Sequence, residues 1–166
     1  MPGDQRRPAC CYFPNMQQGP GNDDARSAAV DALATLARSV DVRDRADAGH
    51  ALAAFAEMIE ARAVLAILLL DDANTFVTLT TAEALLRRKD AAGLTAVAAA
   101  FAAADNTQSE WLGTAVHDVY GVYADDRDAA VDLCAPLTSH PDPEIRSGAT
   151  EMIAILRAIT PVLHPA

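Results

Sequence analysis

Residues Ser139–Leu156 read SHPDPEIRSGATEMIAIL, a stretch in which a proline-containing turn leads directly into an amphipathic helix. Asp142 is a residue type favoured at the N-cap, and Pro143 suits the first helical position because the N–H that it lacks would have no helical partner there. After the turn, apolar residues recur at spacings of three and four. The stretch therefore predicts two helices that meet at a stiff corner, and the fold depends on whether that corner repeats.

The same arrangement recurs along the chain with a period of about 34 residues. Anchors at Val42, Val77, Trp111 and Ile145 each follow a cluster of turn-forming residues. Four residues after the anchors stand the small residues Ala46, Thr81, Ala115 and Ala149. A small residue one turn from an anchor lets a neighbouring helix approach closely. The pattern predicts an all-α fold, an α-solenoid of four stacked helical hairpins.

The expected hairpins pair residues 24–40 with 42–58, 59–70 with 75–88, 91–104 with 108–123, and 126–138 with 143–160. The segment Thr75–Thr81 is rich in β-formers, but it follows a turn and runs into a helical pattern, so that Asn74 or Thr75 can cap a helix there. In the first hairpin a register shifted by two residues fits about as well. Residues 1–22 are expected to be a disordered tail and residues 161–166 a C-terminal tail, with one domain between them.

The segment Asp142–Leu156 resembles the second helix of a HEAT repeat in its Asp-Pro corner, in the pair Ile145–Arg146 and in Ala149. The resemblance extends over about residues 24–160. It implies that Asp142 and Arg146 form a ladder between successive repeats, with Asp41 and Arg43 as a second such pair. It also implies that the second helices of the hairpins line a concave wall.

This resemblance places a polar candidate binding groove on the second helices. The candidate residues are Asp47, His50, Thr80, Glu83, Arg87, Thr114, His117, Asp118, Ser147 and Glu151. Trp111 is expected to fill the core between repeats. For His117 and Asp118 two interpretations stay open, an interaction surface and ordinary solvated helix positions.

The composition limits the classes of partner. The formal net charge of the 166 residues is −10, which repels nucleic-acid backbones, so we expect no nucleic-acid partner. The longest apolar run, AVLAILLL at Ala63–Leu70, is far shorter than the roughly 20 residues of a membrane span. Because no leader pattern precedes it, the expected location is the cytoplasm. Abundant Ala, Asp and Arg beside a single Lys are typical of a bacterial gene rich in G and C.

No sequence motif for chemistry is present. The chain lacks a Gly-rich phosphate loop before a helix, a HExxH segment, paired CxxC segments and an EF-hand loop, and its four histidines are scattered. Of the three cysteines, Cys134 lies in an apolar helical pattern and is expected in the core. We therefore expect no cofactor or metal, and a non-enzymatic module that binds a protein or peptide, such as a basic toxin. The alternative is a HEAT-like enzyme or small-ligand-binding protein, by analogy with bilin lyases.

Overall fold

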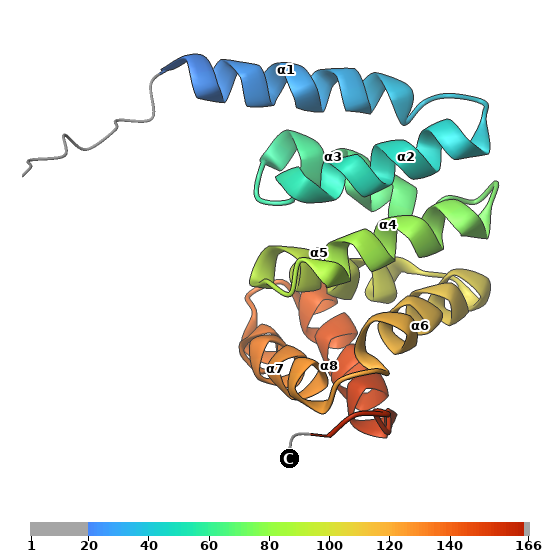
Figure 1. The fold of residues 1–166 in the computed structure, drawn as a ribbon, viewed down its shortest axis with the longest axis vertical. Helices are drawn as coiled ribbons and strands as arrows, with labels where there is room; N and C mark the ends of the chain where they lie inside the picture. Colours follow the sequence, from blue (N-terminus) through green and yellow to red (C-terminus); the bar gives the residue numbers. More distant parts are fainter. Residues whose placement is uncertain (1–19, 165–166) are drawn as a thin grey trace, which may run out of the picture.

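The computed structural model describes residues 20–164, and within them the chain forms eight α-helices (Figure 1). They are α1 (Pro20–Leu36), α2 (Val42–Leu52), α3 (Ile59–Leu69), α4 (Thr75–Arg87), α5 (Ala91–Ala103), α6 (Asn106–Tyr120), α7 (Ala124–Cys134) and α8 (Pro143–Ala158). Short 3-10 helices, η1 (Ala53–Phe55) and η2 (Ala135–Ser139), extend α2 and α7. The predicted all-α class is confirmed, and the predicted starts at residues 42, 59, 75, 91 and 143 coincide with the observed ones.

Both ends of the described chain are more ordered than the sequence predicted. Helix α1 begins at Pro20, so residues 20–22 belong to a helix and not to the tail. Near the C-terminus, Leu163 forms an isolated parallel bridge with Tyr123, and the Leu163 N–H donates to the Val122 carbonyl at 2.8 Å. Residues 161–164 therefore fold back onto the turn between α6 and α7. The rest of the two predicted tails, residues 1–19 and 165–166, lies outside the described residues.

Side-chain caps explain where most of the helices begin. Asp41, Asn74, Asp90, Asp105 and Asp142 each accept a hydrogen bond from a backbone N–H in the first turn of the following helix. Such caps satisfy N–H groups that have no partner within the helix. The cap at Asn74 also confirms that the segment rich in β-formers starts helix α4.

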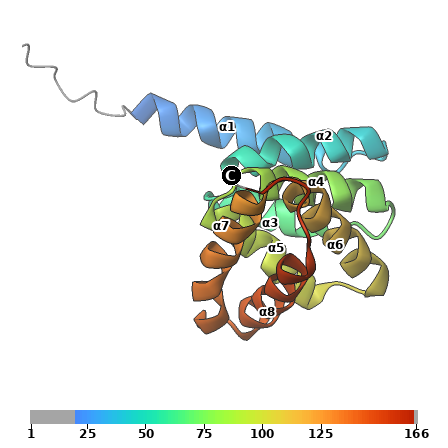
Figure 2. The same ribbon diagram turned by 60° about the horizontal axis from the view of Figure 1, so that its bottom comes forward.

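Helices α2, α4 and α6 lie side by side in one row (Figures 1 and 2). The four small residues predicted to permit close helix contacts, Ala46, Thr81, Ala115 and Ala149, are all buried. At Gly49 on α2 the backbone lies against the side chain of Thr81 on α4, so that any added Cβ would overlap the Thr81 hydroxyl. The predicted small residues are therefore all in the interior, and at Gly49 and Thr81 two neighbouring helices lie in close contact.

The last hairpin packs differently from the others. Helix α8 contacts α6, but its main partner is α5. Gly148 on α8 lies directly on the backbone of α5, where an added Cβ would overlap the carbonyl oxygen of Ala98. The alanine-rich sequence of α5 presents little side-chain bulk, which permits this approach. The row of α2, α4 and α6 is thus followed by a helix that packs mainly on α5, and Figure 2 shows α8 beside α5 and α6.

The proline-containing corner before α8, at residues 139–143, forms as expected, with one difference. Pro143 is the first residue of α8, and Asp142 caps the helix. The Arg146 Nη1 atom, however, donates to the carbonyls of His140 and Pro141, both at 2.8 Å. These bonds are local, so Arg146 stabilises its own corner and does not join successive hairpins.

A contact between successive hairpins is made instead by Arg45. Its Nε lies 2.7 Å from an Asp71 carboxylate oxygen, and both side chains are largely buried. The resemblance had assigned this role to Arg43, which is exposed. Asp41 caps α2 as Asp142 caps α8, and Arg45 stands at the same position after its cap as Arg146. The caps thus match the first hairpin to the last in the register shifted by two residues, in which Ala48, also buried, takes the place of Ala46.

The prediction that Trp111 fills the core is wrong, because the side chain is 36% exposed. The buried residues of α6 include Leu112, Val116 and Tyr120, which follow one another at four-residue steps. Consecutive helical residues point about 100° apart, so Trp111 falls beside this stripe. The Tyr120 hydroxyl donates to the Leu86 carbonyl at 3.0 Å and connects α6 to α4.

Candidate functional site

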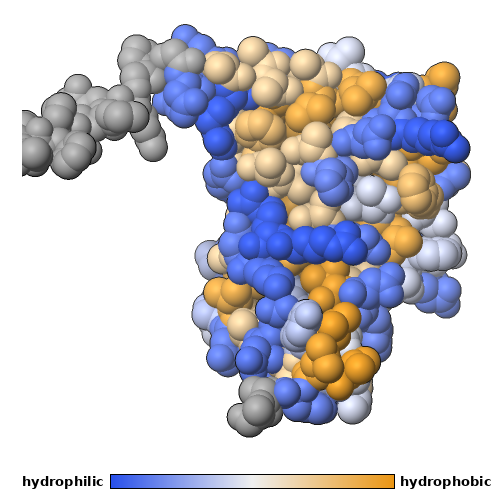
Figure 3. All heavy atoms as spheres, in the orientation of Figure 1, coloured by the Kyte–Doolittle hydropathy of each residue, from blue (hydrophilic) through white to orange (hydrophobic). Residues whose placement is uncertain are grey.

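The exposed sides of α2, α4 and α6 together form a surface that we call the outer face. Residues three and four apart point to the same side of a helix, and because the three helices lie side by side their exposed stripes are neighbours. The outer face consists of Arg43, Asp47 and His50 on α2, Phe76, Thr80, Glu83 and Arg87 on α4, and Thr107, Trp111, Thr114 and Asp118 on α6. In the view of Figure 3, hydrophilic and apolar areas alternate over these helices.

Seven of the ten predicted binding residues belong to the outer face: Asp47, His50, Thr80, Glu83, Arg87, Thr114 and Asp118. His117 is exposed on an adjacent side of α6. Ser147 and Glu151 are exposed on α8, where a Glu151 carboxylate oxygen accepts a hydrogen bond from the Ser109 hydroxyl at 3.2 Å. Because α8 does not continue the row of second helices, these two residues stand apart from the other seven.

Two large aromatic side chains lie on the outer face. Phe76 on α4 is 51% exposed and Trp111 on α6 is 36% exposed. Phe76 precedes Thr80 by one turn and Trp111 precedes Thr114 by three residues, so both belong to the polar stripes that were predicted. Sequence reasoning missed Phe76 and placed Trp111 in the core. Continuing each stripe by one turn towards the start of its helix would have found both.

Three carboxylates, those of Asp47, Glu83 and Asp118, share the outer face with these aromatic residues. Glu83 pairs with Arg87 one turn further along α4, at 2.6 Å. Asp47 and Asp118 form no ion pair with any basic side chain of residues 22–164. Their negative charge is therefore available to a partner.

A network around Glu57 joins the first three hairpins. Glu57 forms ion pairs with Arg26 on α1 and with Arg88, which follows α4; the distance to Arg88 is 3.2 Å. Arg88 also pairs with Asp90 at 2.6 Å and donates a hydrogen bond to the Ala53 carbonyl at 2.7 Å. A hydrogen bond from its own backbone, followed by the charges of Arg88 and Arg26, lowers the pKa of Glu57. Burial opposes ionisation of Asp90, yet the hydrogen bonds from Arg88 and from a backbone N–H outweigh it and lower that pKa as well. The network is structural, because its groups neutralise one another.

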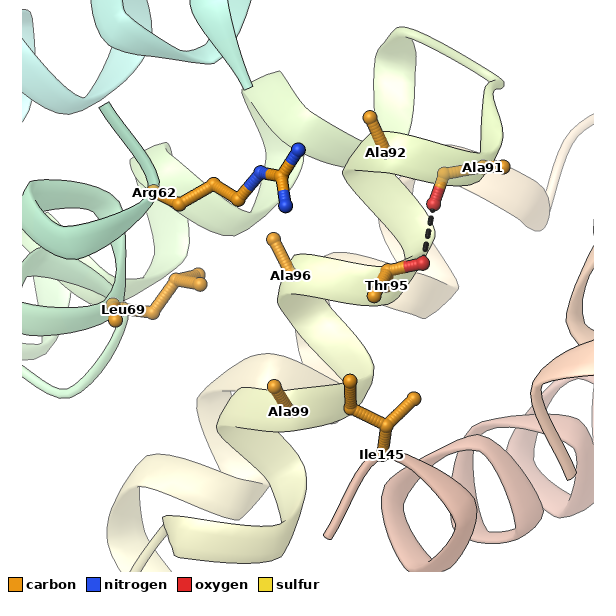
Figure 4. Close-up of a pocket in the computed structure, with 9 residues that line it drawn as sticks. Arg62, Leu69, Ala91, Ala92, Thr95, Ala96, Ala99 and Ile145 are labelled. Atoms are coloured by element: carbon orange, nitrogen blue, oxygen red, sulfur yellow. Dashed lines mark hydrogen bonds between the residues drawn. The ribbon is translucent and has the colours of Figure 1, made fainter. Parts of the chain in front are cut away.

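A second candidate site is a cavity of about 430 Å³ between α3, α5 and the start of α8 (Figure 4). Small or apolar side chains form nearly all of its wall: Ala66 and Leu69 on α3, Ala91, Ala92, Ala96 and Ala99 on α5, and Ile145 on α8. The polar members are Thr95 and Arg62. The Thr95 hydroxyl donates to the Ala91 carbonyl at 2.7 Å, which leaves Arg62 as the main polar group in the wall. None of the ten predicted residues lines this cavity.

Over residues 20–164 no three His, Cys, Asp or Glu side chains are arranged to hold a metal ion. Cys134 is buried, as predicted, and burial raises the pKa of its thiol to about 11. No helix of the described chain is long and apolar enough to cross a membrane.

No protein-family model, curated protein or solved structure matches the chain. A function must therefore be inferred from the structure itself, and the outer face and the cavity are its two candidate binding sites.

Proposed function

We propose that the protein is a non-enzymatic interaction module on a HEAT-like α-solenoid scaffold, and that it binds a basic protein or peptide through the outer face. The scaffold is supported by the row of α2, α4 and α6, by the buried small residues between them and by the capped corners at Asp41, Asn74, Asp105 and Asp142. Stacked helical repeats present a wide, stiff surface, and such surfaces serve binding.

The observation that carries the proposal is the exposure of Phe76 and Trp111 on neighbouring helices. Aromatic side chains are enriched in the centres of protein interfaces, and truncation of tryptophan or tyrosine there often costs more than 2 kcal/mol of binding free energy. A half-exposed phenylalanine and a partly exposed tryptophan lose contact with water when a partner covers them. Their burial would supply affinity on a surface that is otherwise polar.

Charge indicates what kind of partner fits. Asp47 and Asp118 lie on the outer face without a basic partner in the described chain, and the protein as a whole carries a net charge of −10. Complementary charge steers association and disfavours partners of the same sign. A basic protein surface meets these conditions, and a toxin that acts on nucleic acid is one example of such a partner.

Affinity capture from lysate, with bound proteins identified by mass spectrometry, tests the proposal. The wild type is compared with Phe76→Ala/Trp111→Ala, which removes the anchors, and with Asp47→Lys/Asp118→Lys, which reverses the charge. Leu133→Ala is the matched control, because Leu133 is 37% exposed but lies on α7. Circular dichroism confirms that each variant is folded.

The expected result is a basic protein that the wild type and Leu133→Ala retain and that both outer-face variants lose. A partner retained equally by all four proteins would show that binding, if it occurs, uses another surface. Capture of an acidic protein by the wild type would contradict the charge argument.

A further inference from the structure

We propose that the cavity between α3, α5 and the start of α8 binds a small aliphatic carboxylate with a chain of about eight carbons, whose carboxylate pairs with Arg62. This site is separate from the outer face and does not depend on the function proposed above.

The wall of the cavity suits an alkyl chain. Helix α5 has no charged residue in its 13 positions, and four of its alanines line the cavity together with Leu69 and Ile145. Alanine side chains leave space where longer ones would fill it. A volume of about 430 Å³ falls within the range of pockets that hold small molecules, which are mostly apolar with a few placed polar groups.

Arg62 is held in place by its own turn. Its Nε donates to the Ala56 carbonyl at 3.1 Å and its Nη2 to the Glu57 carbonyl at 2.7 Å. These bonds use two of the five N–H donors of the guanidinium. Figure 4 shows the side chain reaching from α3 towards Ala92 and Ala96 on α5, across the cavity. An arginine fixed in this way is prepared to bind an anion, since little side-chain freedom is left to lose.

Comparison with Arg45 shows that a carboxylate can pair with an arginine held in this way. Both arginines stand four positions after the cap residue of their helix, and both donate to the carbonyls five and six residues earlier. Arg45 is also paired with the carboxylate of Asp71, at 2.7 Å. Arg62 has no carboxylate partner among residues 22–164. Arg146 makes the same two backbone bonds and likewise has no carboxylate partner among residues 22–164. What distinguishes Arg62 is its place in the wall of the cavity, where a ligand can supply the carboxylate.

The dimensions set the length of the ligand. Arg62 and Leu69 are seven residues apart on α3, which corresponds to roughly 10 Å along the helix axis. Ala92 and Ala99 mark the same span on α5, and Ile145 lies beside Ala99 at the end away from Arg62 (Figure 4). An extended chain advances about 1.2 Å per bond, so roughly eight carbons fill this span.

Calorimetric titration of the full chain with octanoate, 1-octanol and octylammonium tests the proposal, together with backbone amide chemical shifts to locate the site. We expect saturable 1:1 binding of octanoate, shift changes on α3 and α5, and an affinity at least about tenfold above that of 1-octanol, because the ion pair adds a charge-assisted hydrogen bond. Octylammonium should bind most weakly. Arg62→Gln should remove the preference of octanoate over octanol.

Filling the cavity provides an independent test. Ala96→Leu should abolish binding, with Ala99→Leu as a second variant if the first does not fold. Ala102→Leu is the matched control, because Ala102 is an exposed alanine of α5 that does not line the cavity. It should bind octanoate as the wild type does.

Equal affinities for octanoate and octanol, no saturable binding, or unchanged binding by folded Ala96→Leu would each overturn the proposal. If a segment of residues 1–19 fills the cavity instead, octanoate will not bind, and Ala96→Leu will shift the amide resonances of that segment. That result also overturns the proposal and identifies the true occupant.

Discussion

Replacing Gly148 with alanine should destabilise the protein, although alanine is the better helix former. Gly148 lies in the middle of α8, where it packs on the backbone of α5, and the added methyl group would overlap the carbonyl oxygen of Ala98. A carbonyl in a helix cannot rotate away as a side chain can. Helix α8 must therefore move off α5, and the buried residues of that interface, such as Met152, would lose contacts.

The magnitude follows from two opposing effects. In a helix interior, glycine to alanine gains roughly 1 kcal/mol. Overpacking of a close contact costs about 1–3 kcal/mol, and the rigid obstacle at Ala98 favours the upper end. The net expectation is a loss of about 2 kcal/mol, which in a chain of this length lowers Tm by roughly 4–8 °C.

Gly113→Ala is the matched control. Gly113 also lies within a helix, but the nearest atom to an added Cβ is the Ile155 Cδ1 at 3.9 Å, an ordinary contact distance. Only the helix-forming gain applies, so Tm should rise by roughly 2–4 °C. Thermal unfolding of both variants followed by circular dichroism measures the difference. If Gly148→Ala is as stable as the wild type, the close crossing of α8 and α5 is refuted.

Three other predictions follow from named contacts. Gly49→Ala should destabilise the protein by roughly 1–2 kcal/mol, because the added methyl group meets the Thr81 hydroxyl. Adding Thr81→Ala should recover part of that loss, since it makes room for the methyl group and removes a buried hydroxyl without a partner. A double-mutant cycle followed by urea unfolding measures the coupling, and additive effects of the two substitutions would contradict the contact. In the folded state, a hydrogen bond from its own backbone and the charge of Arg88 lower the pKa of Glu57. The ionised Glu57 carboxylate therefore stabilises the folded protein fully at pH values above its pKa in the unfolded chain, and this stabilisation is lost as the pH falls through its pKa in the folded protein. Stability should therefore decrease below about pH 4.5, and Arg88→Gln should reduce the slope in acid titration of Tm, whereas an unchanged slope would exclude the pair. Cys134, with a pKa of about 11, should react with iodoacetamide at pH 7.5 only under denaturing conditions, as peptide mass spectrometry can show; rapid labelling of the native protein would contradict its burial.

Local chemistry made much of the fold predictable. Asp142 with Pro143 and Asn74 are strong helix-start signals, because a cap residue acts on N–H groups only two or three positions away. The small residues were predictable for a related reason. A residue such as Ala149 or Thr81 is recognised by its spacing from an apolar anchor on the same helix, without knowledge of the partner helix.

The remaining features depend on contacts between distant segments. Trp111 was wrongly placed in the core because a sequence pattern locates the buried stripe of a helix only to within about one residue. A shift of one residue turns the side chain by about 100° around the helix axis. The crossing of α8 over α5 depends on how Gly148 meets Ala98, 50 positions earlier in the chain, which no local pattern expresses. The cavity beside Arg62 was missed because its wall consists mostly of alanines, which look like ordinary helix positions in a sequence.

Hydroxyl-radical footprinting of the protein alone and with its captured partner, read out by mass spectrometry, tests the outer-face proposal most directly. Phe76 and Trp111 should be oxidised in the free protein and protected in the complex. Ile67, which is 71% exposed on α3, should be oxidised equally in both. Protection of Ile67 with unchanged oxidation of Phe76 and Trp111, or a Trp111 that is unreactive in the free protein, would contradict a binding function of the outer face.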